Sequence, residues 1–158
     1  MQVGNPKLTI LFLCTGNSAR SQMAEGWARH SKGDMIEPYS AGVEAHGLNP
    51  YAVMAMKEAG VDISGQRSKL VEAVMGIEFD YVITLCGHAN ENCPLFPGRT
   101  RVIHVGFEDP AKAHGTEEEV MAAFRRVRDD IQAFVQSLPG FLQRAGSTNE
   151  LPQKHLSP

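Results

Sequence analysis

Cys14 and Arg20 stand six positions apart in the stretch FLCTGNSARS, and the residues between them are small or polar. If this stretch joins a strand to a helix, its backbone N–H groups form a nest for an anion, and the helix N-terminus adds partial positive charge. Gly16 supplies conformational freedom, and Asn17 tolerates a left-handed backbone. The planar guanidinium of Arg20 can hold two oxygens of a tetrahedral oxyanion. The residues expected to bind the oxyanion are Thr15, Gly16, Asn17, Ser18, Ala19, Arg20 and Ser21.

Cys14 lies at the base of this expected loop. Helix N-termini and nearby cations lower the pKa of a thiol from about 8.5 to roughly 3.5–7.5, and Ser21 could donate a hydrogen bond to the sulfur. Cys14 is therefore a candidate nucleophile that faces the centre of a bound oxyanion. The alternative is a buried strand cysteine followed by a solvated helix cation. A bare cysteine–arginine spacing is common, and it is the strand–loop–helix context that favours the catalytic interpretation.

Cys86 and Cys93 are the other two cysteines of the chain. A nucleophilic phosphatase needs one thiol, but a thiol reductase must supply two electrons and needs a second sulfur. Cys86 ends an expected strand, and Cys93 follows seven positions later in a segment with Gly87, Asn90 and Asn92 that should open easily. Two alternatives remain: a buried Cys86 with an idle Cys93, or a zinc site in which His88 joins the two cysteines as only three ligands.

Asp109 precedes Pro110 in the stretch GFEDPAKAHG. A carboxylic acid above an oxyanion can protonate a leaving oxygen, and the proline would stiffen the loop that bears the acid. Without further context, an aspartate at the exit of a strand is more often a turn residue.

Short apolar runs alternate with helical patterns along the chain. Strands are expected at residues 7–13, 37–43, 79–86 and 101–107. Helices are expected at residues 21–30, at 50–59 with Asn49 as N-cap and Gly60 after the end, from about Ser68, and after a capping box of Thr116 and Glu119. This order predicts a single α/β domain with a four-stranded parallel sheet and helices on both faces. Ligands of such sheets bind beyond the carboxyl ends of the strands, where Cys14, Cys86 and Asp109 would meet.

The composition is that of an ordinary globular protein of 158 residues with a net charge of −3. We expect one folded domain over residues 1–144 and a disordered tail over residues 145–158. The charge argues against a nucleic-acid partner, and no apolar stretch is long enough to span a membrane. The N-terminus is a poor signal peptide, so we expect a cytoplasmic protein in which the cysteines form no permanent framework. No apolar stripe remains after the core is assigned, which predicts a monomer.

Five stretches together resemble a known family: CTGNSARSQMAEGWA, YSAGVEAHGLNP, VITLC, GFEDPA and FRRVRDDI. They are similar to the thioredoxin-coupled arsenate reductases, which are built on the low-molecular-weight protein tyrosine phosphatase fold, and the resemblance extends from about Leu8 to Phe134. It implies reduction of arsenate to arsenite, with phosphate or sulfate as competing oxyanions, thioredoxin as the reductant, and neither a metal nor an organic cofactor.

The resemblance also implies roles for the candidate residues. Cys14 attacks arsenic while Asp109 acts as the general acid and Arg20 holds the oxyanion. Cys86 then attacks the Cys14 sulfur, arsenite leaves, and Cys93 takes over the disulfide on a segment that thioredoxin can reach. Cys14, Cys86, Cys93, Arg20 and Asp109 are thus the expected catalytic residues.

The chain departs from related families at three places. Eukaryotic-type phosphatases place aromatic residues after the Asp-Pro pair, whereas this chain has the sequence AKAH, which disfavours an aryl phosphate. Many close relatives have a cysteine where this chain has Ala19. Some relatives bind potassium through four side chains, three of which match Asn17, Glu25 and Ser40. The fourth is Lys69, whose ammonium could contact the same oxygens and remove the potassium dependence.

Two other functions remain open at this point. The same loop and acid would suit a phosphatase that acts on small phosphomonoesters. The same cysteines would suit a non-enzymatic sensor of oxyanions or metals.

Overall fold

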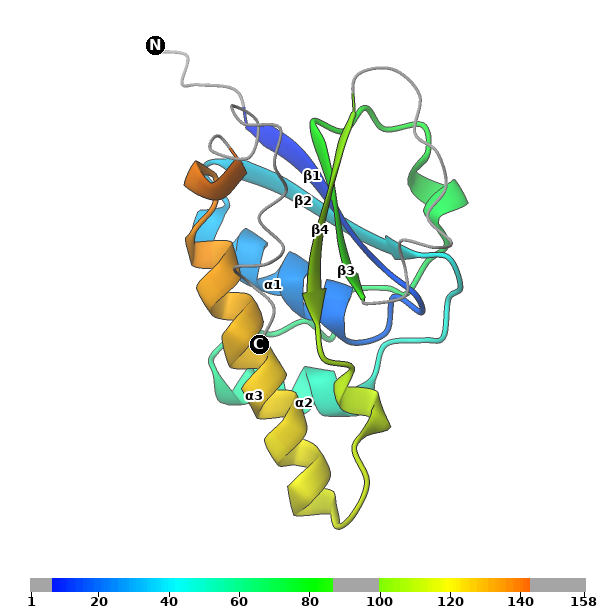
Figure 1. Cartoon of the computed structure of the whole chain (residues 1–158), viewed down its shortest axis with the longest axis vertical. Helices are drawn as coiled ribbons and strands as arrows, with labels where there is room; N and C mark the ends of the chain where they lie inside the picture. The colour runs from blue at the N-terminus through cyan, green and yellow to red at the C-terminus, as the bar shows by residue number, and fades with distance from the viewer. Residues whose placement is uncertain (1–6, 87–99, 143–158) are drawn as a thin grey trace.

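A computed structural model describes residues 7–86 and 100–142 of the chain. The expected tail over residues 145–158 and Cys93 lie outside these described residues, so the proposed domain boundary stays a prediction. Four parallel strands form one sheet in the order β2–β1–β3–β4 (Figure 1). The strands are β1 (Leu8–Cys14), β2 (Ile36–Gly42), β3 (Tyr81–Cys86) and β4 (Arg101–Phe107).

The three α-helices of the described residues pack on one face of this sheet. They are α1 (Arg20–Lys32), α2 (Pro50–Glu58) and α3 (Glu117–Gln136). Alternate residues of β1, such as Ile10 and Phe12, are fully buried against them together with Met23 and Phe124. On the other face, Leu11 and Leu13 pack with residues of the 3₁₀ helix η1 (Val71–Val74). The expected parallel sheet is confirmed, and η1 is the described helix on its second face.

Local signals in the sequence set the helix ends as expected. The Asn49 side chain accepts hydrogen bonds from the first turn of α2, and Gly60 after the helix has a φ of 88°. Thr116 and Glu119 form the predicted capping box at the start of α3. In the described part of the chain, no helix is both long enough and apolar enough to cross a membrane.

The helix expected from Ser68 is wrong in its start and its type. Leu70 is extended, and the 3₁₀ helix η1 begins only at Val71. The N–H of Gly42 donates to the carbonyl of Lys69 at 2.9 Å, and Leu70 forms a β-bridge with Gly42. These contacts with the end of β2 hold the segment in an extended form that its local sequence does not favour.

The carboxyl ends of β1 and β4 and the start of α1 converge on one side of the sheet (Figure 1). Helix α1 begins at Arg20, one residue earlier than expected, so the connection after Cys14 is only five residues long. Because Ala19 occupies the N-cap position and has no capping side chain, no side chain competes there for the first N–H groups of the helix. The fold therefore places a helix N-terminus beside the end of the central strand.

Candidate active site

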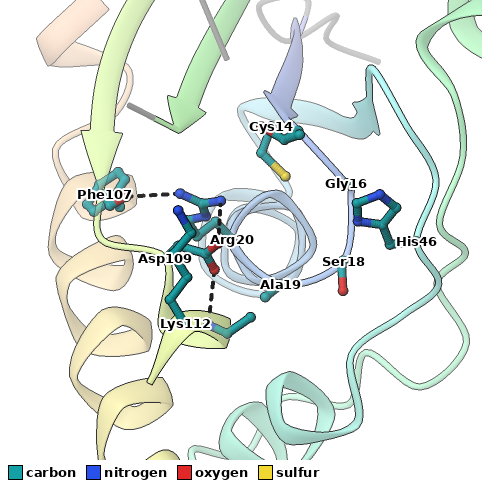
Figure 2. A pocket seen from close by; sticks show the side chains of 11 residues that line it. Cys14, Gly16, Ser18, Ala19, Arg20, His46, Phe107, Asp109 and Lys112 are labelled. Carbon is teal, nitrogen blue, oxygen red and sulfur yellow. Dashed lines mark hydrogen bonds and ion pairs between the residues drawn. The ribbon is translucent and has the colours of Figure 1, made fainter. Parts of the chain in front are cut away.

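A cavity of about 490 Å³ opens at this edge of the sheet, with Cys14 at its inner end (Figure 2). Its lining residues are Cys14, Thr15, Gly16, Ser18, Ala19, Arg20, His46, Phe107, Asp109, Ala111 and Lys112. Most residues of the predicted oxyanion loop thus surround one cavity together with the predicted acid. Asn17 and Ser21, which we expected to bind the oxyanion, are fully buried and are not among the lining residues.

Asn17 and Ser21 instead support Cys14 from behind. The Asn17 side chain donates to the Ser21 hydroxyl oxygen at 2.8 Å, and that oxygen lies 2.8 Å from the Cys14 sulfur. Because Ser21 accepts from Asn17, its own hydroxyl hydrogen can point to the sulfur, which favours the thiolate. Asn17 also has a φ of 48°, so the predicted left-handed residue is confirmed.

The outward carbonyl groups of the loop are held by residues 44–49, which we call the strap. The carbonyl oxygens of Thr15, Gly16 and Ser18 accept hydrogen bonds from the strap N–H groups of Glu44, His46 and Asn49, at 2.8, 2.9 and 3.0 Å. When these carbonyls bond to the strap, the loop N–H groups can face the cavity, as an anion nest requires. The strap therefore fixes the loop before any anion arrives.

Gly16 has a role that differs from the conformational freedom that we predicted. Its φ is not in the left-handed region, but a Cβ atom at this position would lie 2.4 Å from Nδ1 of His46. The glycine thus permits the imidazole to pack directly on the loop, while Nε2 of that ring pairs with Glu44 at 2.5 Å. Nothing in the sequence around His46 indicates that this residue borders the cavity.

Arg20 is held between the loop and the end of β4. Its guanidinium donates to the carbonyl oxygen of Phe107 at 3.1 Å and lies 3.4 Å from a carboxylate oxygen of Asp109 (Figure 2). Only 10% of the Arg20 side chain is exposed, compared with 27% for Asp109. The guanidinium is therefore already oriented at the cavity and links the predicted anion site to the predicted acid.

Asp109 caps a short 3₁₀ helix, η3 (Pro110–Lys112), that borders the cavity. One carboxylate oxygen accepts the Ala111 N–H at 3.0 Å, and the other faces Arg20. The neighbouring carboxylate, Glu108, points elsewhere and pairs with Arg126 at 2.8 Å on the surface. Of these two acidic residues, only Asp109 lines the cavity.

Cys86 is placed by its backbone at the end of β3. Leu13 and Thr84 are register partners on the adjacent strands β1 and β3, so Cys86 is one residue beyond the level of Cys14. Neighbouring strands lie about 4.8 Å apart and rise about 3.3 Å per residue, which puts the two Cα atoms within the range that disulfides span, about 4.4–6.8 Å. The β3–β4 pairing shifts register between Thr84 and Cys86, as at a bulge.

Protein donors occupy the side chains that match the potassium site of some relatives. The side-chain oxygen Oδ1 of Asn17 accepts hydrogen bonds from the Gln22 side chain at 3.0 Å and from the Lys69 backbone N–H at 2.8 Å. Glu25 accepts from the Ser40 hydroxyl at 2.5 Å and pairs with an arginine of α1, Arg29, at 2.9 Å.

The expected contact of the Lys69 ammonium with these oxygens is only partly right. The Lys69 ammonium donates a hydrogen bond to the Arg67 carbonyl oxygen, at 2.8 Å. Burial lowers the pKa of Lys69, and the negative charge of Glu25 acts against that shift. The Lys69 ammonium is therefore near the Glu25 carboxylate, but the direct ion pair with Glu25 is made by Arg29.

The predicted zinc alternative cannot be placed, because His88 and Cys93 lie outside the described residues. Among residues 7–86 and 100–142, no three histidine, cysteine, aspartate or glutamate side chains are grouped to hold a metal ion. His104, on β4, forms a hydrogen bond with the Thr84 hydroxyl at 2.7 Å, and burial lowers the pKa of His104.

The fold and the cavity are those of a known family. The chain belongs to the low molecular weight phosphotyrosine protein phosphatase family, which it matches over residues 9–148. An arsenate reductase from Bacillus licheniformis is 60% identical over 125 residues, which cover 79% of this chain and 90% of that protein.

Solved structures agree with this assignment. An arsenate reductase in the phosphate binding state is 33% identical, with a TM-score of 0.65 over 83% of this chain and 95% of that one. Another, in the oxidized state, is 33% identical, with a TM-score of 0.68 over 82% of this chain and 95% of that one. The resemblance predicted from the sequence is confirmed by these relatives.

Proposed function

We propose that the protein reduces arsenate to arsenite with its own three cysteines. Arsenate enters the nest of residues 15–20, and Arg20 holds two of its oxygens. The Cys14 thiolate attacks arsenic while Asp109 gives a proton to the departing oxygen, which leaves as water. Cys86 then attacks the Cys14 sulfur, so that the As–S bond breaks, arsenite leaves with two electrons, and a Cys14–Cys86 disulfide forms.

A second exchange restores the nucleophile. Cys93 attacks the Cys86 sulfur, which releases Cys14 and forms a Cys86–Cys93 disulfide. An external dithiol protein, thioredoxin, reduces that disulfide by the same chemistry. We propose that the enzyme acts as a cytoplasmic monomer whose domain comprises residues 1–144.

The observation that best supports this proposal is the position of Cys14. Its sulfur lies at the inner end of a cavity lined by an anion nest and Arg20, and the backbone of Cys86 ends the adjacent strand at the same edge. Relatives named arsenate reductases share this fold. A phosphatase of the same family would need the cavity and Asp109, but it would have no use for the neighbouring cysteine.

Thiol counting after a single exposure to arsenate tests the proposal. The fully reduced protein is mixed with arsenate in the absence of any reductant, and free thiols and arsenite are measured together. We expect two thiols to disappear for each arsenite formed, because the reduction consumes two electrons. A sensor would lose no thiols, and a phosphatase would form no arsenite, so either result would contradict the proposal.

Cys93→Ser separates the reductase from the phosphatase. With this variant, a first turnover should still form a Cys14–Cys86 disulfide, whereas repeated turnover with thioredoxin should stop. Hydrolysis of a small phosphomonoester, if the cavity supports it, should be unchanged. Repeated turnover at the wild-type rate would show that the third cysteine has no part in the relay.

A further inference from the structure

The cavity above Cys14 is much larger than the ion that we propose as substrate. Its volume is about 490 Å³, whereas a tetrahedral oxyanion of five heavy atoms fills about 60–90 Å³, the share of two or three water molecules in the liquid. Cavities of several hundred Å³ usually hold organic molecules. There is therefore room for a substituent on the oxyanion.

The position of such a substituent follows from the geometry of the loop. Three oxygens of a tetrahedral anion fit into the nest, so the fourth points away from Cys14 and toward the cavity mouth. Asp109 and Lys112 both line this part of the cavity (Figure 2). They are three residues apart on a 3₁₀ turn, where such residues lie one above the other. Lys112 therefore borders the space beyond the fourth oxygen.

Lys112 is suited to meet a negative group. Its side chain is exposed at the rim, and Ala111 beside it is too small to fill the space. Within residues 7–86 and 100–142 the Lys112 ammonium takes part in no ion pair, whereas Arg125, Arg126 and Arg128 of α3 are each paired with carboxylates. The carboxylate on its own turn, Asp109, faces Arg20.

We propose that Lys112 forms a subsite for a second negative group, so that the cavity binds small organic phosphates that bear a carboxylate close to the ester oxygen. Such esters would occupy the nest with the phosphate and reach Lys112 with the carboxylate. They would compete with arsenate more strongly than phosphate esters whose alkyl group carries no charge. The subsite depends on the anion nest and not on electron transfer, so it extends the proposed function without requiring it.

Two matched probes test the subsite on the reduced full-length chain by isothermal titration calorimetry: carboxymethyl phosphate and ethyl phosphate. We expect carboxymethyl phosphate to bind about three- to fivefold more tightly, as for one exposed ion pair. Lys112→Ala should remove this preference, and Lys112→Arg should keep most of it. Binding of ethyl phosphate and of inorganic phosphate should stay within about twofold in both variants.

Lys57→Ala is the matched control, since Lys57 is an exposed lysine on α2 outside the cavity, and it should leave the preference intact. Equal affinity of wild type for the two esters would overturn the subsite, even if arsenate reduction is found. An equal loss for both esters in Lys112→Ala would also overturn it, because Lys112 would then act on the phosphate itself. Conversely, the expected preference in a protein that fails to reduce arsenate would refute the proposed reaction and leave the subsite standing.

Discussion

The two sides of the cavity are built differently. On one side, the loop of residues 15–20 has its carbonyls bonded to the strap and its Asn17 side chain fully buried. On the other side, η3 is a single 3₁₀ turn, and its acid is held by one backbone N–H and by Arg20. An anion nest must be rigid before its ligand arrives, because reorganisation would weaken it. A general acid must come within hydrogen-bond reach of the reacting oxygen, and such contacts often tighten only when the substrate is bound, so a looser attachment suits the acid.

Asp109→Asn tests the looser side, and we expect it to have the largest effect. We expect kcat for arsenate reduction to fall about 10²- to 10⁴-fold, the usual contribution of a general acid. The affinity for arsenate should not fall, because Arg20 loses a competing partner and remains in the nest. Steady-state kinetics separates the two quantities. Glu108→Gln, at the neighbouring carboxylate outside the cavity, is the control and should keep kcat.

Gly42→Ala tests the rigid side. A Cβ atom at this position would lie 2.4 Å from the Glu44 carbonyl oxygen and 2.8 Å from backbone atoms of Thr15 and Asn17, so the loop and the strap must separate. We expect the free energy of unfolding to fall by about 1–3 kcal/mol and Tm to fall by roughly 3–10 °C. Phosphate should also bind more weakly.

Gly65→Ala is the matched substitution, because a Cβ atom at Gly65 meets no other atom within 4 Å. Its stability should be unchanged or higher by up to about 1 kcal/mol. Thermal unfolding of the two variants beside wild type makes the comparison. Equal melting temperatures would show that the loop and the strap can move apart at little cost.

A change at His104 tests β4, the strand that leads to Asp109. Burial lowers the pKa of His104 in the folded state below the value of about 6.5 in the unfolded chain. The unfolded state therefore binds more protons as the pH falls below about 6.5, and folding stability is lost across that range. We expect a modest loss between pH 7.5 and pH 5 that is smaller in His104→Gln, which can still bond to Thr84. Thermal melts of wild type and His104→Gln at both pH values make the comparison, and an equal loss of stability in the two proteins would contradict the prediction.

Potassium is expected to have the smallest effect, because protein donors already contact the oxygens of Asn17 and Glu25. Replacing sodium by potassium should change Tm by less than about 2 °C, which corresponds to less than about 1 kcal/mol in the free energy of unfolding. Lys69→Asp, which restores a carboxylate at this position, should respond more strongly to potassium. A large rise in Tm or activity of the wild-type protein would contradict the prediction and imply that the loop lacks internal support.

Much of the fold follows from short stretches of sequence. The apolar runs that become β1 and β4, the N-cap Asn49 and the capping box at Thr116 act within a few residues, so their outcome depends little on the rest of the chain. The start of η1 was mispredicted because residues 69 and 70 are held by Gly42, far away in sequence.

The candidate site divides in the same way. The sequence is enough to indicate an anion nest between Cys14 and Arg20 and an acid at the Asp-Pro pair. Each of these features lies within a few consecutive residues. The hydrogen bonds from the strap, the packing of His46 on Gly16 and the place of Lys112 at the rim depend on the crossover connections of the sheet. Those contacts join segments dozens of residues apart, and only the folded chain decides which of them meet.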